Sequence, residues 1–136
     1  MSTLNNAISA AASALDVQRA RLEVAVSNMA NAESTHGPDG TPYRRREVLL
    51  ESGADGQPDG FGVHVSAIVE DQSPFQRRFE PSHPDADSTG FVSMPNVDVP
   101  EEMVDMLGAA RAYQANLAAI TVIRETVQKA LELGRA

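Results

Sequence analysis

A short stretch of the sequence gathers side chains that could carry out metal or acid–base chemistry. His83, Asp85 and Asp87 fall within residues 81–87, a run that also contains two prolines. Imidazole and carboxylate groups are common metal ligands, but no second cluster supplies further His or Glu at a recognisable spacing. A turn built from Pro and Asp is therefore the favoured interpretation, and a metal site is the alternative.

The same stretch partly imitates the start of a calcium-binding loop. The residues at the opening positions are Asp85, Asp87, Thr89 and Gly90. Position twelve would be Asn96 instead of the usual bidentate Glu, and the helical flanks of such a loop are lacking. We therefore expect neither a bound metal nor a cofactor here.

The remaining histidines and the fingerprints of known enzyme classes offer no reaction. His36 lies in a predicted turn, and His64 lies within an alternating strand pattern on the face opposite Phe61, where we expect solvent. No nucleophile elbow, phosphate loop or dinucleotide fingerprint occurs. We therefore predict that the protein is not an enzyme.

Composition narrows the possible partners. The 136 residues carry a formal net charge of -8 and include no cysteine. Nucleic acids and anionic membrane surfaces demand a basic patch, and the densest basic run, residues 44–46, is better explained as a local ion-pairing surface. Without cysteine the chain has no disulfide or thiolate chemistry. We therefore expect no nucleic-acid partner.

Neither a membrane span nor a cleaved leader is predicted. No apolar run approaches the roughly 20 residues that a spanning helix needs. A Sec-type signal peptide would begin with positive charge, whereas the first charged side chain here is Asp16. If the chain leaves the cytoplasm, we expect a route that needs no cleaved signal.

Helix-breaking residues divide the chain into three parts. All eight prolines lie within residues 38–100, and seven of the nine glycines lie within residues 37–90. Because Pro and Gly interrupt regular structure, we predict an N-terminal coiled-coil helix over residues 1–35, a β-rich insert over residues 36–97 and a C-terminal coiled-coil helix over residues 98–136. The predicted fold class is mainly α, with short antiparallel strands between the two helices.

The N-terminal part follows a seven-residue apolar repeat. Its seam residues, spaced alternately by four and three, are Leu4, Ile8, Ala11, Leu15, Gln18, Leu22, Ala25 and Met29. This is the a/d pattern of a coiled coil, interrupted only by Gln18. Because so long a helix exceeds what the small insert could cover, we predict an assembly interface; a helix packed on its own domain is the alternative.

The C-terminal part repeats the pattern. Its predicted interface residues are Met103, Met106, Ala110, Tyr113, Leu117, Ile120, Val127 and Leu131. Asp98 and Glu101 have the spacing of a capping box, which predicts the start of the helix, and Gly134 predicts its end. The two helices can pair antiparallel within one chain or join helices of other chains.

The insert contains strand signals. Residues 61–67 alternate apolar with small or polar side chains, which predicts a strand, and Val69 continues the pattern. Residues 48–50 and residues 75–79 are candidate partners for this strand. A turn rich in Gly, Asp and Pro is predicted at residues 55–60.

The end of the first predicted helix resembles a known family. Asn28, Asn31 and Thr35 lie in the run SNMANAEST, which begins at Ser27. This run is similar to the Asn-x-x-Asn-x-x-Thr hallmark of the bacterial flagellar axial proteins, which comprise rod, hook and hook-associated subunits. The departure is small: Glu33 and Ser34 replace residues that are commonly Asn or Asp and Thr in the family.

Further stretches make the resemblance more specific, since they match the C-type proximal rod proteins of that family. The matching residues are Pro42, Tyr43 and Arg44, then His83, Pro84, Asp85 and Asp87, and finally Pro95 and Asn96. With residues 111–116 they span nearly the whole chain in the family's order. Ser82 and Phe91 stand where the family usually has Gly and Tyr.

This resemblance implies a structural subunit of the flagellar basal body, located in the periplasmic rod that serves as the drive shaft. It implies export in an unfolded state through the flagellar type III apparatus, which needs no cleaved signal. Its partners would be other rod subunits and further copies of itself, and its terminal helices would be disordered until assembly pairs them into coiled-coil layers. The alternative is a cytoplasmic coiled-coil adaptor or export chaperone.

Overall fold

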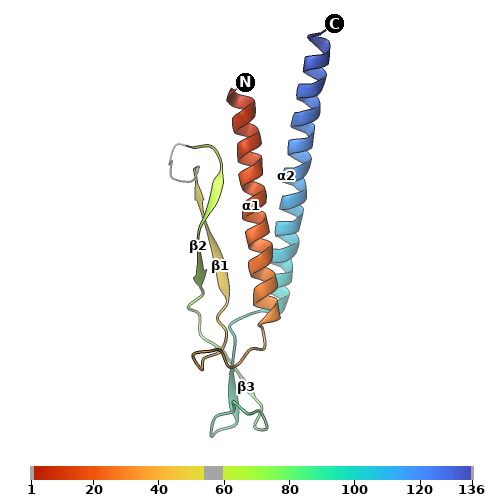
Figure 1. The fold of residues 1–136 in the computed structure, drawn as a ribbon. Coiled ribbons are helices and arrows are strands. Elements are labelled where there is room, and N and C mark those ends of the chain that lie inside the picture. The colour runs from red at the N-terminus through yellow and green to blue at the C-terminus, as the bar shows by residue number, and fades with distance from the viewer. Residues whose placement is uncertain (1, 54–59, 136) are drawn as a thin grey trace.

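The computed structural model describes residues 2–53 and 60–135 and contains a pair of long helices beside two short β-ribbons (Figure 1). Helix α1 (Ser2–Ala30) runs towards the ribbons and α2 (Val99–Leu133) runs back beside it, so both chain ends lie at the same end of the molecule (Figure 1). The prediction of a mainly helical fold with a short strand insert is confirmed. The turn predicted at residues 55–60 lies, apart from its last residue, outside the described residues.

The start of α2 is fixed by a side-chain cap. The Asp98 carboxylate accepts a hydrogen bond of 3.1 Å from the backbone N–H of Glu101, and Pro100 lies in the first turn, where its missing N–H costs no helical bond. The helix ends at Leu133, directly before Gly134. Both predicted boundaries are confirmed.

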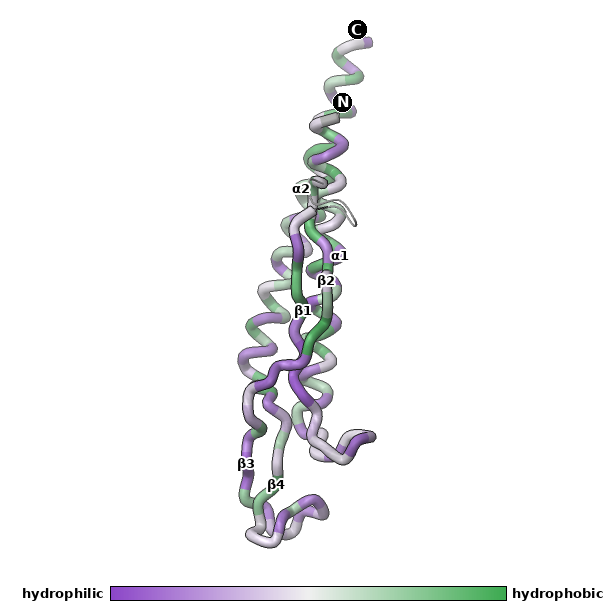
Figure 2. Tube along the Cα trace, turned by 90° about the vertical axis from the view of Figure 1, so that its left-hand side faces the viewer, coloured by the Kyte–Doolittle hydropathy of each residue, from purple (hydrophilic) through white to green (hydrophobic). Residues whose placement is uncertain are grey.

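Helix α1 is covered on two sides. Helix α2 packs along one side, and strands β1 (Arg46–Ser52) and β2 (Val63–Glu70) form a ribbon along another (Figures 1 and 2). Val17 and Ala25 are its most buried apolar residues, with 2% and 4% of their surface exposed. Helix α2 therefore supplies cover for α1 within the chain, which is one of the two pairings that the sequence allows.

The strands form two separate ribbons. β1 and β2 pair antiparallel, which confirms the predicted strand around residues 61–67 and its pairing with residues 48–50. Strand β3 (Gln76–Phe79) does not join them, because it pairs antiparallel with β4 (Phe91–Met94), a strand that the sequence did not predict. The predicted pairing of residues 75–79 with the first ribbon is therefore wrong.

A turn after β2 explains this separation. The Asp71 carboxylate accepts a hydrogen bond of 2.8 Å from the Ser73 N–H. The Asn96 side chain donates to the Asp71 carbonyl at 3.0 Å and so ties the turn to the segment before α2. Pro74 follows and has no N–H to donate to a strand ladder. The chain therefore leaves the first ribbon and pairs with the segment that leads into α2.

The interior is small for the length of the chain. The buried apolar residues among those described are Val17, Ala25, Val92, Met94, Val97 and Ala109. The accessible surface is 9249 Å², whereas a compact monomer of this mass exposes about 6,900 Å². The molecule is elongated, and much of its apolar surface faces solvent.

Candidate functional site

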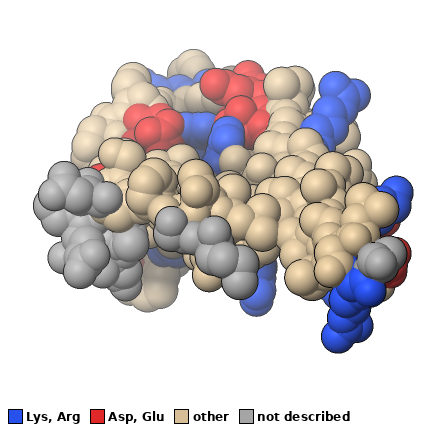
Figure 3. Space-filling view, turned by 90° about the horizontal axis from the view of Figure 1, so that it is seen from above, with Lys and Arg blue, Asp and Glu red and all other residues tan. Residues whose placement is uncertain are grey.

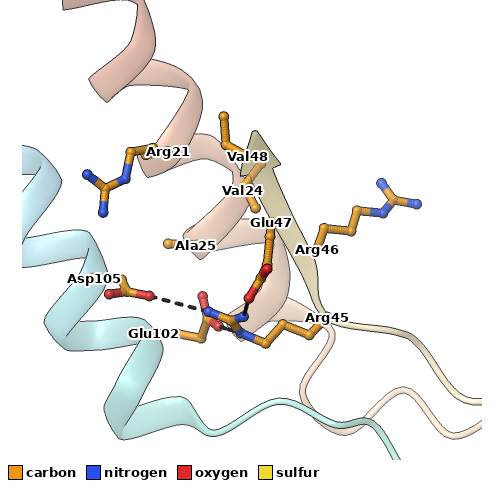
Figure 4. A pocket seen from close by; sticks show the side chains of 9 residues that line it. All are labelled: Arg21, Val24, Ala25, Arg45, Arg46, Glu47, Val48, Glu102 and Asp105. Atoms are coloured by element: carbon orange, nitrogen blue, oxygen red, sulfur yellow. Dashed lines mark hydrogen bonds and ion pairs between the residues drawn. The ribbon is translucent and has the colours of Figure 1, made fainter. Parts of the chain in front are cut away.

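Four polar side chains meet where α1 ends and both β1 and α2 begin. We call Asn28, Arg45, Asn96 and Glu102 the clamp. Asn28 and Glu102 have 0% and 1% of their surface exposed, and Figure 4 shows the Arg45 guanidinium beside the Glu102 carboxylate. Because these residues come from distant parts of the sequence, the clamp ties the two helices and both ribbons together.

Asn28 uses its whole side-chain amide. Its Nδ2 donates to the Glu102 carboxylate at 3.0 Å and to the Arg46 carbonyl at 2.9 Å. Its Oδ1 accepts from the Arg46 N–H and from the Tyr43 hydroxyl, both at 2.9 Å. Each of these four hydrogen bonds crosses from α1 to another segment. A buried amide that is satisfied in this way fixes one relative position of the helices and the ribbon.

Arg45 places a cation among carboxylates at the same point. It pairs with Glu102 and Glu47, and lies 3.4 Å from Asp105 and 3.8 Å from Asp71. Only 14% of its side chain is exposed. Burial opposes its charge, but the hydrogen bonds and charges of Glu102 and Glu47 outweigh burial and raise the pKa of Arg45. The interpretation of this basic run as a local ion-pairing surface is confirmed at Arg45, and the acids that it pairs with belong to the same chain.

Asn96 extends the clamp to the second ribbon. Its Oδ1 accepts a hydrogen bond of 2.8 Å from the Arg45 N–H, and its Nδ2 donates to the Ser73 carbonyl at 3.2 Å. Arg44 donates to the same Ser73 carbonyl at 3.1 Å and stacks on the Phe75 ring, 4.3 Å from its centre. Pro95, directly before Asn96, is fully buried. The predicted family residues of this region therefore lie together.

The rest of the helix-end motif connects α1 to the turn of the second ribbon, which β3 and β4 form. The Asn31 side chain donates to the Ser27 carbonyl at 2.9 Å, and the Asn31 backbone N–H donates to the same carbonyl at 3.1 Å, so Asn31 closes the last turn of α1 twice. The Thr35 hydroxyl donates to the Asp85 carboxylate at 2.7 Å, and His36 lies 3.7 Å from the same group. Two stretches that were predicted to identify the family, far apart in sequence, are thus in contact.

The stretch from His83 to Asp87 forms the turn between β3 and β4. The Asp85 N–H donates to the His83 ring at 3.1 Å. The Asp87 carboxylate accepts bonds from Thr89 and Phe91 and pairs with Arg77 at 2.7 Å. These partners, the Thr89 hydroxyl first among them, lower the pKa of Asp87 to about 2. The favoured interpretation as a turn is confirmed, and Pro84 lies exposed within it.

Two other kinds of site were sought in residues 2–53 and 60–135. No group of three or more His, Asp or Glu side chains in these ranges is arranged to hold a metal ion. Neither described helix is long and apolar enough to span a bilayer. The polar groups that the structure gathers are engaged with one another, and no buried side-chain nitrogen or oxygen among them lacks a hydrogen-bond partner.

The predicted interface residues fall into two groups. The half-buried residues are Leu4, Ile8, Ala11, Leu15, Gln18, Leu22 and Met29 on α1 and Met106, Ala110, Tyr113, Ile120 and Val127 on α2. Met103 and Leu117 have 49% of their surface exposed, and Leu131 has 65% exposed. Helix α2 therefore keeps apolar surface that its own chain does not cover.

Sequence reasoning missed two features of this site. Val17 lies outside the predicted seam and is buried. Glu102 was not among the predicted site residues, yet it is the buried partner of Arg45. A signal was present, because Glu102 lies four residues before Met106 and so on the seam side of the helix.

Comparison with known proteins gives the class. Residues 88–133 match the family described as flagellar basal body rod FlgEFG protein C-terminal. The flagellar basal-body rod protein FlgC of Salmonella typhimurium strain LT2 is 46% identical over 133 residues, which are 97% of this chain and 98% of that protein. The protein of the same name from Bacillus subtilis strain 168 is 37% identical over 149 residues, covering 98% of this chain and 99% of the relative.

Two terminal helices around a short β insert, together with these full-length matches, define a structural subunit of the flagellar basal-body rod. A third relative, from Agrobacterium fabrum strain C58, is 39% identical over 137 residues and covers 100% of this chain and 99% of its own length. The chain belongs to the FlgC family of flagellar basal-body rod proteins.

The clamp predicts a large stability loss for Glu102→Ala. The change leaves Arg45 partly unpaired in a buried place and removes an acceptor of Asn28. We expect the free energy of unfolding to fall by about 3 kcal/mol, as when one partner of a buried ion pair is removed. Urea unfolding followed by far-UV circular dichroism measures the change.

The matched control is Glu23→Ala, which breaks the exposed Arg19–Glu23 pair on α1. That pair spans one helical turn at the surface, so its loss should cost no more than about 0.5 kcal/mol. Equal unfolding midpoints for the two variants would contradict the role given to the clamp.

The turn at Asp87 predicts a dependence on pH. Its carboxyl has a pKa of about 2 in the folded chain and an ordinary value of 3.8. A lowered folded pKa gives stability that is present above 3.8 and is lost as the pH falls towards 2. The melting temperature of the native chain should therefore exceed that of Asp87→Asn near neutral pH and approach it on acidification. A difference that stays constant across this range would show that the Asp87 charge is not the cause.

Proposed function

We propose that the chain is a subunit of the proximal rod, located in the periplasm, which assembles with copies of itself and with other rod proteins into a shaft that transmits torque. Membership of the FlgC family supports the rod itself. Assembly into a torque-transmitting shaft is supported by the apolar surface that α2 leaves exposed. It is also supported by the clamp, which fixes the register of the two helices.

A shaft subunit must resist twisting, and the clamp suits this requirement. The α2 helix has 35 residues, so at about 1.5 Å per residue it is a rod of about 50 Å. Two such helices slide easily when only apolar seams join them, whereas the four hydrogen bonds of Asn28 allow one register. Load applied to one helix is thereby passed to the other and to the ribbons.

We further propose that the predicted seams of both helices complete coiled-coil layers between neighbouring subunits. Met103, Leu117 and Leu131 already lie at the edge of the seam and remain exposed. The helix ends farthest from the clamp would become ordered when neighbours cover them, as in folding coupled to binding. Export in an unfolded state through the type III apparatus, without a cleaved signal, would precede this step.

The alternative is a cytoplasmic coiled-coil adaptor or export chaperone. Such a protein would also need long helices with apolar surface. It would not need the contact that Thr35 and Asp85 make between the helix-end motif and the turn joining β3 to β4. The rod relatives of nearly equal length favour the rod subunit over this alternative.

Replacement of the native FlgC-family subunit in a flagellated bacterium tests the proposal. We expect the chain to restore swimming and to be present in isolated basal bodies. Leu117→Asp, which puts a charge on the exposed edge of the α2 seam, should abolish both, since the charge would have to be buried between helices. Ser93→Asp, on the exposed side of β4, is the control and should swim. A chain that stays in the cytoplasm and is absent from basal bodies would support the adaptor.

A further inference from the structure

The side of α2 that points away from α1 is apolar and uncovered. Val104, Leu107 and Val122 have 68%, 53% and 60% of their surface exposed. Gly108 lies on the same side, and a Cβ placed there would meet no atom within 4 Å. Gly weakens a helix interior, and nothing within the chain requires it at this position. Close approach of another backbone is a reason for its presence.

The amount of exposed surface indicates more than one contact for each copy. The excess of the 9249 Å² surface over that of a compact monomer is about 2,300 Å². One partner's share of a standard stable interface is about 800 Å². A single self-matching dimer contact would therefore leave most of the excess uncovered, whereas two different surfaces on each copy would use more of it.

The positions of charges that lack an ion pair in the described part of the chain indicate which surface of a second copy lies against the outer face of α2. Arg111 lies in the outer face of α2 and makes no ion pair with any residue that the structure describes, and α2 has no acidic residue from 106 to 124. The exposed side of α1 carries Asp16, which also makes no ion pair within the described ranges. Its neighbours on that side, Ala12 and Ser9, are small enough for close packing.

We propose that the outer face of α2 in one copy packs on the exposed side of α1 in the next copy, with Arg111 paired to Asp16; this rests on the proposed rod function. Copies arranged around one axis share an orientation, so these two helices run antiparallel, as they do within the chain. Both surfaces then follow the same spacing of four, three and four residues. The facing pairs are Asp16–Arg111, Ala12–Ala115, Ser9–Ala118 and Asn5–Val122.

This contact joins two different surfaces. Contacts of that type close into rings or continue as helical arrays, whereas a self-matching contact stops at a dimer. Small side chains face one another along it, which lets the helices approach closely, and Arg111 gains an acidic partner that residues 106–124 of its own helix do not supply. Around the N-terminal end of α1, much of the surface in Figure 3 is free of charged side chains, so this contact buries few charges besides the proposed pair.

Cysteine cross-linking tests the contact, because the native chain has no cysteine. Ala12→Cys and Ala115→Cys are combined in one chain that replaces the native subunit, and isolated basal bodies are oxidised and run on a non-reducing gel. A disulfide requires the two Cα atoms to lie within about 7 Å. We expect a ladder at multiples of the subunit mass, and loss of the ladder in a matched chain with Ala12→Cys and Ser93→Cys.

Exchanging the charges at residues 111 and 16 in the cross-linking chain gives a second test of the contact. Arg111→Glu should remove most of the ladder, and Arg111→Glu combined with Asp16→Arg should restore it. A chain that is present in basal bodies but gives no more ladder than the control overturns this contact and leaves the rod function standing. A product that contains one copy joined to a different protein also overturns it. Absence of the native chain from basal bodies overturns the rod function itself.

Discussion

The buried pairing of Arg45 with Glu102, completed by Asn28, is the constraint on which the rest of the structure depends. A charge with 14% of its side chain exposed is costly unless it is paired and hydrogen-bonded. The partners of Arg45 come from β1 and α2, and Asn28 of α1 donates to the same Glu102 carboxylate. The helices therefore have one register that satisfies these groups. The turn after β2 and the entry into α2 are held at the same point by Asn96, so both ribbons take their positions from the clamp.

This arrangement makes the two ends of the molecule physically different. The clamp end holds the hydrogen bond that joins the two helices to each other and the ion pair that joins Arg45 to α2, whereas farther along α1 Ser13 accepts a hydrogen bond of 3.1 Å from Val63 of β2. Farther from the clamp, residues 2–15 and residues 112–123 carry no charge, so no ion pair can join these two stretches. Local stability should therefore fall along the helices away from the clamp, because contact density and hydrogen bonding between segments fall in that direction. For a subunit that is built into a rod, the weakly held end is the part that neighbours can order.

The helices could be read from the sequence, since proline-free flanks, heptad spacing and the Asp98 cap all act locally. The clamp could not be predicted from the sequence, because Asn28 and Glu102 meet across 74 residues. Periodicity predicts which face of a helix is buried, but it does not predict which element covers that face. Strand β4 was missed for a related reason: it has four residues and is defined by its pairing with β3. Val17 shows the same limit, as its burial depends on the ribbon that packs on a second side of α1. The family resemblance singled out Thr35 and Asp85 separately, and only the structure brought them into contact.

The clamp holds the two helices together from one end. Amide hydrogen exchange of the free chain, followed residue by residue, tests this, because exchange reports local opening. We expect the slowest exchange in α1 and α2 close to Asn28 and Glu102, and steadily faster exchange towards Leu4 and Leu131. Equal protection along both helices, or slower exchange at the far end than at the clamp, would contradict it.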